Sequence, residues 1–194
     1  HRGVDLLEKF KVPIYKIASF EITDYRLISY IASKKKPIII STGMANLQEV
    51  RNAVKILKKY GSKKIIVLHC VSNYPAKLDS LNLSAIGYLR KKIKTPVGWS
   101  DHSSNPLVIL QSVEKWKSDF VEMHIDLDGR GYEFNSGHCW LPERAKKIIS
   151  FIRKLKVING KSKKKPNIHE LEERKFRADP LDGLRPIKKY RKFL

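Results

Sequence analysis

"TPVGWSDHSSNPLV", residues 95–108, begins as an apolar strand and then places three polar side chains, Ser100, Asp101 and His102, directly after it. A helical pattern follows at once, from Asn105 onward. A continuous apolar strand that leads into a helix is typical of a parallel sheet covered by helices. Polar residues at the C-terminal ends of such strands are where these folds place their binding and catalytic groups.

The same unit of strand and helix recurs along the chain. Apolar strands are predicted over five segments: 12–18, 37–41, 64–69, 96–100 and 119–125. Helical patterns are predicted over five others: 24–34, 46–60, 84–92, 105–116 and 142–156. Five consecutive βα units predict an α/β protein built on a parallel sheet.

Two architectures fit this succession, an open doubly wound sheet and part of an eight-stranded (β/α)8 barrel. Polar residues follow most of the predicted strands: Ser19, Ser41, Thr42, His69, Ser100, Asp101, His102 and His124. In a barrel all of these positions converge on one rim, whereas an open sheet gathers only those near its switch point. We therefore expect about the last five βα units of a TIM-type barrel, with about three units preceding His1.

Composition narrows the classes of function. The 194 residues include 42% hydrophobic residues, enough for a buried core, and no apolar run reaches the about 18 residues of a membrane helix. The formal charge of +21 favours anionic partners, but the lysines are scattered without interleaved aromatic residues, so nucleic acid is not the expected partner. Two cysteines, Cys70 and Cys139, are too few for a disulfide framework, which favours a reducing, cytoplasmic location.

Side-chain alternation predicts which groups share one face of the sheet. It places Ser100 and His102 on one side of their strand, and Glu122 and His124 on one side of the next. Adjacent strands lie about 4.8 Å apart, so the two imidazoles can reach one divalent ion such as Mn²⁺, Zn²⁺ or Fe²⁺. The alternative is that both histidines are hydrogen-bonded groups at the rim.

Lys16 interrupts the apolar stretch VPIYKIAS, residues 12–19. A buried ammonium without a partner is costly, so Lys16 requires either an anion or a solvated lumen, unless its side chain extends outward between helices. Together with Ser19 and with the segment Ser41-Thr42-Gly43 after the next strand, it predicts a small cradle of hydroxyls, backbone N–H groups and one cation for an oxyanion or a phosphate.

Five motifs, in this order, resemble the sialic acid synthase family, whose members make N-acetylneuraminate and related nonulosonic acids. The motifs are YKIASFEITD (15–24), KPIIISTGMANLQEV (36–50), VLHCVSNYPAK (67–77), VGWSDHSS (97–104) and VEMH (121–124). The resemblance implies a (β/α)8 barrel in which phosphoenolpyruvate condenses with an N-acetylated aminosugar, such as N-acetylmannosamine, and releases phosphate. It also implies a homodimer and a divalent metal, usually Mn²⁺, with Mg²⁺ or Co²⁺ as alternatives.

The resemblance further implies roles for individual residues. His102 and His124 correspond to metal ligands, and Asp101 and Glu122 become the candidate catalytic carboxylates. The candidate substrate-binding residues are Lys16, Ser19, Ser41, Ser72, Asn73, Tyr74 and Ser100. Ser100 and the serines of the cradle would contact phosphoenolpyruvate, while Asn73 is an alternative to Ser72. Cys70 and Cys139 are expected to be structural.

The chain departs from the family in its C-terminal part. The loop DLDGRGYEFNSGHCWLPE, residues 126–143, replaces a Gly-Pro-Asp-His type of loop, and its Glu133 and His138 are candidate sugar contacts. We expect a barrel portion over 1–157 and a basic extended tail over 158–194, without an antifreeze-like domain, and an inactive protein if the chain acts alone. The alternatives are another phosphoenolpyruvate-dependent or metal-dependent aldol-type barrel, or a basic nucleic-acid-binding protein on a degenerate barrel.

Overall fold

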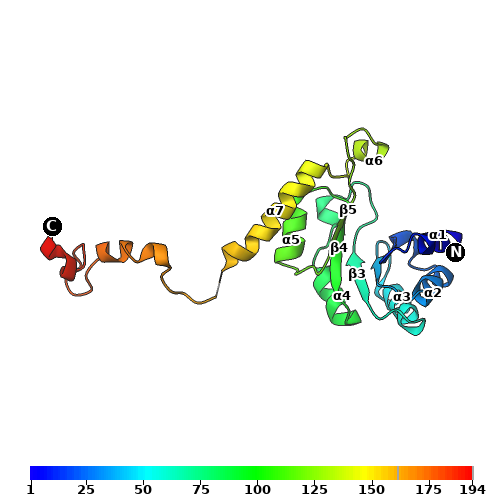
Figure 1. Cartoon of the computed structure of the whole chain (residues 1–194), viewed down its shortest axis with the longest axis horizontal. Helices are drawn as coiled ribbons and strands as arrows, with labels where there is room; N and C mark the ends of the chain where they lie inside the picture. Colours follow the sequence, from blue (N-terminus) through cyan, green and yellow to red (C-terminus); the bar gives the residue numbers. More distant parts are fainter. Residues whose placement is uncertain (161, 194) are drawn as a thin grey trace. The chain divides into compact units, whose positions relative to one another are not determined.

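The computed structural model describes residues 1–160 and 162–193. The chain divides into two compact units, His1–Lys154 and Leu155–Leu194. The first unit holds every strand and is shown with its helices in Figure 1.

The first unit is built on five strands that form one parallel sheet. The strands are β1 (Tyr15–Ile17), β2 (Ile38–Ser41), β3 (Ile65–His69), β4 (Val97–Asp101) and β5 (Val121–Met123). They lie in the order β1-β2-β3-β4-β5, and each pairs in parallel with the next. Each strand is added at the same edge of the sheet, so the strand order does not reverse at any point among the described strands. This regular order is that of a barrel wall.

The sheet is strongly curved. Lys16 on β1 lies 3.3 Å from Glu122 on β5, measured between Nζ and Oε2. Three strands separate β1 from β5, and a flat sheet would keep their backbones about 19 Å apart at the usual strand spacing. The contact across the concave face therefore shows that the five strands form an arc.

Helices connect the strands and surround them in Figure 1. Their bounds are α1 (Arg2–Lys9), α2 (Tyr25–Ser33), α3 (Leu47–Lys59), α4 (Ala85–Ile93), α5 (Pro106–Glu114), α6 (Tyr132–Asn135) and α7 (Pro142–Asn159). Side chains at the N-termini fix where several begin: Asn46 forms a capping box with Glu49, and Asn105 accepts a hydrogen bond from the Leu107 N–H. Within the described residues, none of these helices is both long enough and apolar enough to cross a bilayer.

The core lies between the sheet and the helices. Alternate residues of each strand face this layer, and those of β2, β3 and β4 are almost completely buried: Ile38, Ile40, Val67, Val97 and Trp99. The intervening residues, among them Lys16, Ser100 and Glu122, face the concave side. The alternation of side chains along the strands thus separates an apolar layer, which stabilises the fold, from a face whose polar groups are available for chemistry.

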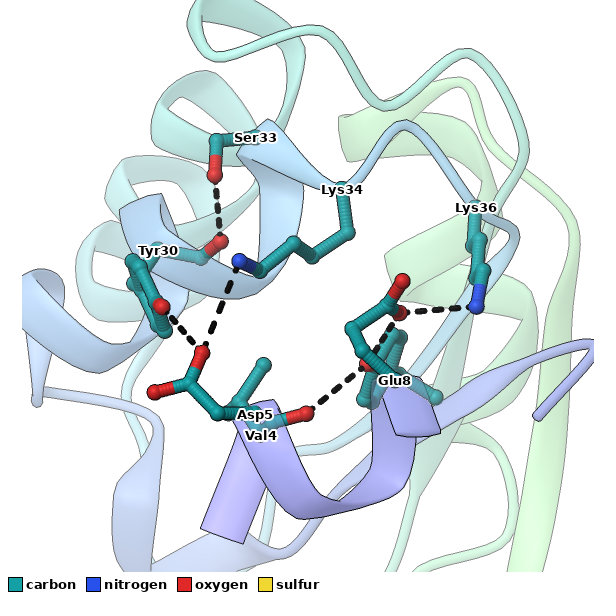
Figure 2. Close-up of polar contacts among 8 residues, drawn as sticks. Val4, Asp5, Glu8, Tyr30, Ser33, Lys34 and Lys36 are labelled. Atoms are coloured by element: carbon teal, nitrogen blue, oxygen red, sulfur yellow. Dashed lines mark hydrogen bonds and ion pairs between the residues drawn. The ribbon is translucent and has the colours of Figure 1, made fainter. Parts of the chain in front are cut away.

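Helix α1 and the loop before β2 are joined by ion pairs, which Figure 2 shows. Lys36 Nζ lies 2.7 Å from Glu8 Oε1, and the Tyr15 hydroxyl donates to the same carboxylate. Lys34 Nζ lies 3.7 Å from Asp5 Oδ1. The sequence patterns did not predict α1, because it contributes only one buried side chain and is held mainly by these polar contacts. The contacts fix the start of β1 and therefore the position of Lys16.

The second unit contains short 3₁₀ turns, among them Ile168–Glu170, Glu173–Phe176 and Lys188–Phe193. Asp179 organises part of it by accepting hydrogen bonds from the backbone N–H groups of Leu181 and Lys188. The predicted tail, 158–194, also includes Lys161 and Leu194, which lie outside the described residues.

The ion pairs of α1 give a testable pH dependence. Hydrogen bonds from Lys36 and Tyr15 hold the pKa of Glu8 below its ordinary value. A carboxyl group whose pKa is lower in the folded than in the unfolded protein stabilises the fold at pH values above its unfolded-state pKa. This stabilisation is lost as the pH falls through its folded-state pKa. Glu8→Gln should therefore lower the melting temperature at pH 7, and its difference from the parent should narrow below about pH 4.

Thermal unfolding followed by circular dichroism measures this difference. Glu21→Gln, the same chemical change beyond the other end of β1, is the matched control. A melting temperature for Glu8→Gln that equals the parent's at pH 7, or a gap that stays constant down to pH 3, would contradict the role of this contact.

Candidate active site

Three side chains from three strands meet on the concave face. Ser100 on β4 donates a hydrogen bond of 2.6 Å to Glu122 on β5, and the same carboxylate faces the ammonium of Lys16. Both members of the ion pair keep about a third of their side-chain surface exposed, 33% for Lys16 and 30% for Glu122. Lys16 therefore points into a solvated lumen and does not extend outward between helices.

Glu122 is held as a carboxylate. Its burial alone would raise the pKa, but the hydrogen bond from Ser100 and the positive charge of Lys16 outweigh this effect, so the pKa lies below its ordinary value. At neutral pH Glu122 is consequently ionised, and it can accept a proton but has none to donate.

Small side chains converge on Gly43, and one of them belongs to Ser19, three residues after Lys16. The Gly43 N–H donates to Ser19 Oγ over 3.1 Å, and Ser19 Oγ lies 3.0 Å from Cys70 Sγ. A Cβ at position 43 would lie 2.0 Å from Ser72 Oγ and 2.9 Å from Ser19 Oγ, so only glycine leaves room for this arrangement. The buried hydroxyl of Ser41 has no hydrogen-bond partner in the described structure. These groups fit an anion that would supply the missing acceptor.

At the rim, His102 is fixed in one tautomer. Its Nδ1–H donates to the Val71 carbonyl over 2.7 Å, which leaves Nε2 with a free lone pair. Burial lowers the pKa of His102, and the hydrogen bond to Val71 offsets this only in part, so the ring is neutral at pH 7. A neutral imidazole whose other nitrogen is held by a carbonyl is the form that binds metals.

The rings of His102 and His124 lie with their centroids 5.1 Å apart. Two imidazoles that bind one ion at about 2.1 Å, with tetrahedral angles, place their centroids about 5 Å apart. The two histidines therefore fit a shared divalent ion. Tyr74 packs beside them, with its ring 4.4 Å from that of His102.

The loop after β5 brings further donors to His124. Glu133 Oε2 lies 3.7 Å from His124 Nδ1 and 3.8 Å from His138 Nε2. Ligand atoms of His124, Glu133, His138 and Cys139 all lie within 4.8 Å of one another, a group that could hold a metal ion. The sequence named Glu133 and His138 as candidate sugar contacts and expected Cys139 to be structural.

Asp101 is not part of this group. Asp101 lies two positions after Trp99 on β4, so its side chain is on the same side of the sheet, facing the helices. Its carboxylate is completely buried there. It accepts hydrogen bonds from the indole N–H groups of Trp99 (3.2 Å) and Trp140 (2.9 Å). It also accepts from the backbone N–H groups of Ser103 and Ser104. The geometry gives Asp101 a positioning role.

Two other polar residues lie away from the concave face. His69, expected at the rim, points outward, where Nε2 contacts the Leu81 carbonyl over 3.0 Å and the ring packs on Trp99. Asn73 is exposed, and its side chain accepts a hydrogen bond from the Tyr74 N–H. Sequence reasoning grouped Gly43 with Ser19 but missed Cys70 as a neighbour of Ser19. Counting alternate residues from Leu68 would have placed Cys70 on the concave side.

The comparison with known protein families shows which family the chain belongs to. Residues 1–164 match the model of the NeuB family. The chain belongs to the NeuB family. The predicted resemblance to the sialic acid synthases is therefore confirmed, since NeuB relatives include an N,N'-diacetyllegionaminic acid synthase from Legionella pneumophila that is 37% identical over 174 residues.

Solved structures agree with this assignment. An N-acetylneuraminic acid synthetase from Leptospira borgpetersenii, crystallised with citrate, is 33% identical with a TM-score of 0.75; the match covers 88% of this chain and 59% of that one. A truncated 3-deoxy-D-arabino-heptulosonate 7-phosphate synthase from Thermotoga maritima, 18% identical, has a TM-score of 0.64 over 77% of this chain and 60% of its own. This second likeness concerns the fold alone, and together they confirm the predicted TIM-type barrel class.

The NeuB chain studied spans about half the length of the curated relatives it matches. The Legionella match covers 88% of this chain but 49% of the relative.

The buried carboxylate of Asp101 should be essential to stability. Asp101→Asn would turn an amide N–H toward indole donors that need an acceptor, so we expect a loss of about 2–4 kcal/mol in the free energy of unfolding. Urea unfolding followed by tryptophan fluorescence measures it. Asp79→Asn, the same change on an exposed carboxylate, is the control. A loss no larger than that of the control would show that Asp101 does not hold the turn.

Gly43→Ala tests the cradle without removing any polar group. The new methyl would displace Ser19 and Ser72 from their positions, so affinity for phosphate should fall at least tenfold while the melting temperature changes little. Gly3→Ala is the control, because a methyl there meets nothing within 4 Å. Isothermal titration with phosphate decides the outcome, and unchanged affinity would remove the cradle from the site.

Proposed function

We propose that this chain is the part of a synthase barrel that condenses phosphoenolpyruvate with an N-acylated aminosugar to give a nonulosonic acid and phosphate. The observation that supports the proposal is that Lys16, Ser19 and Ser41, the candidate anion-binding residues, lie on the same face of the curved sheet as His102 and His124. NeuB relatives named as legionaminic acid, pseudaminic acid and N-acetylneuraminate-9-phosphate synthases support it.

The anion-binding group suits phosphoenolpyruvate, which carries a phosphate and a carboxylate. Lys16 would supply a positive charge, and Ser41 would supply a hydroxyl that has no hydrogen-bond partner among the described residues. Ser19, Ser72, Tyr74 and Ser100 remain predicted contacts around this anion, and Asn73 is the alternative to Ser72. Rigid orientation of the two reactants accounts for much of the rate in such a condensation.

The aminosugar would bind toward the rim, with its open-chain aldehyde near His102 and His124. A divalent ion held by these imidazoles would polarise the aldehyde oxygen, with Mn²⁺ as the expected ion and Mg²⁺ or Co²⁺ as alternatives. His102 contributes through Nε2, because Nδ1 is occupied by the Val71 carbonyl.

Glu122 is the proposed catalytic carboxylate. In the condensation the electrons of the C2–C3 double bond of phosphoenolpyruvate would form a bond from C3 to the aldehyde carbon, and the aldehyde oxygen would take up a proton and become a hydroxyl. Water would then add at the electron-poor C2, and the C2–O bond to phosphate would break as the new C2 hydroxyl loses its proton and becomes a ketone. The water must lose a proton, and the ionised Glu122 is suited to accept it. Asp101, which the sequence also named, would act by holding the turn that carries His102.

The remaining expectations stay predictions. These are a homodimer, a cytoplasmic location, which the two free cysteines favour, and a division into a barrel portion (1–157) and a tail (158–194).

Lys16→Met separates the two substrates. In a protein that contains the whole barrel, the affinity for phosphoenolpyruvate should fall about 100-fold, since one charge-assisted contact is worth about 1.5–3 kcal/mol, while aminosugar affinity stays near that of the parent. Lys55→Met, which removes the same charge from the exposed face of α3, is the matched control. Isothermal titration gives both affinities.

Equal losses for the two substrates in Lys16→Met would contradict the assigned role of Lys16.

Glu122→Gln, in contrast, should keep the affinities for both substrates within a few-fold of the parent's, while the rate of phosphate release falls to a small fraction of the parent's. A panel of aldehyde acceptors then distinguishes a nonulosonic acid synthase from another aldol-type barrel, because only the former requires an N-acylated aminosugar.

A further inference from the structure

We propose that the loop after β5 completes a four-residue metal centre in which His124, Glu133, His138 and Cys139 bind one divalent ion. Their ligand atoms lie within 4.8 Å of one another, although His124 directly follows β5 and the other three residues stand 9 to 15 positions further along the chain. Glu133 Oε2 is the common neighbour, at 3.7 Å from His124 Nδ1, 3.8 Å from His138 Nε2 and 4.0 Å from Cys139 Sγ.

The histidine rings support the same grouping. The centroids of His124 and His138 lie 5.1 Å apart, the same separation as between His124 and His102. His138 Nδ1 is engaged by Ser136 Oγ at 2.8 Å, so Nε2 is the nitrogen that faces Glu133. As with His102, a hydrogen bond on one ring nitrogen directs the other toward the ion.

The loop is fixed next to His124 by backbone hydrogen bonds. The Trp140 N–H donates to the His124 carbonyl over 2.8 Å, and the Asp126 N–H donates to the Trp140 carbonyl over 2.9 Å. The indole of Trp140 is in turn held by Asp101. His138 and Cys139, each 4% exposed, are therefore preorganised, whereas the Glu133 side chain is 67% exposed and free to close on an ion.

The donor set indicates which ion binds. Two imidazoles, one carboxylate and one thiolate are ligands that Zn²⁺ accepts in tetrahedral sites, and Co²⁺ follows the same preference. Mn²⁺ prefers oxygen ligands and gains little from a thiolate. The loop therefore favours Zn²⁺ or Co²⁺ over the Mn²⁺ that the family resemblance implies. The inference rests on the proposed function only in placing an ion at His124; in its ligand set the three loop residues take the place of His102. Binding of the ion is measurable without turnover.

Titration of the purified 194-residue chain with Co²⁺ tests the centre, because a cobalt–thiolate bond gives a charge-transfer absorption in the near ultraviolet. We expect one Co²⁺ per chain with this absorption. Cys139→Ser should abolish it, and His138→Ala should weaken Co²⁺ binding at least about tenfold. Glu133→Gln changes an exposed side chain that the fold does not require, and it should also weaken Co²⁺ binding. Circular dichroism confirms that each variant is folded.

His102→Ala is the contrasting variant, because His102 lies outside the proposed set of four ligands. Absence of the thiolate absorption in the parent, or unchanged Co²⁺ affinity in folded His138→Ala and Glu133→Gln, would overturn the inference. If affinity then depends on His102 and His124 alone, the ion lies between those two rings and the proposed function stands. If the parent binds no Co²⁺, Zn²⁺ or Mn²⁺ at all, both the loop centre and the metal-assisted function fail.

Discussion

The buried carboxylate of Asp101 is the contact on which the site depends, although it touches no expected substrate. It lies on the helix side of β4 and joins three parts of the chain through hydrogen bonds: Trp99 on its own strand, the turn that follows His102, and Trp140 at the end of the β5 loop. A carboxyl group without solvent exposure is tolerated only when hydrogen-bond donors surround it. The hydrogen bonds that satisfy Asp101 therefore also hold the turn that carries His102 and the loop that carries His138.

Strand alternation decides what each of these residues can do. Ser100 and Asp101 are neighbours in sequence, yet one faces Glu122 in the lumen and the other faces indoles in the core. Curvature adds the second requirement, since only an arc brings Lys16 within ion-pair distance of Glu122 across three intervening strands. Polar chemistry on the concave face is thus compatible with a largely apolar layer on the convex face, in which Asp101 is held by hydrogen bonds.

The sequence predicted the strands and most helices because apolar runs and capping residues are local signals. It overestimated the first strand, 12–18, because the Val12 N–H bonds back to Leu7 of α1 and the sheet starts only at Tyr15. It placed His69 at the rim, although alternation from Val67 sends that ring outward. The meeting of Glu133 and Cys139 with His124 had no local signal, since it depends on backbone pairing between Trp140 and His124.

The ion pair of Lys16 and Glu122 has a consequence for ligand binding. An isolated ammonium on the concave face would be costly, and Glu122 compensates its charge while both side chains remain partly solvated. Because the pair is exposed to about a third, its net attraction is weak, and an anion with several oxygens can compete for the ammonium. Ser100 continues to hold Glu122 as a carboxylate after such an exchange. The pair therefore keeps the ammonium of Lys16 available on an otherwise apolar strand, and it leaves the ionised carboxylate of Glu122 beside any anion that the ammonium binds.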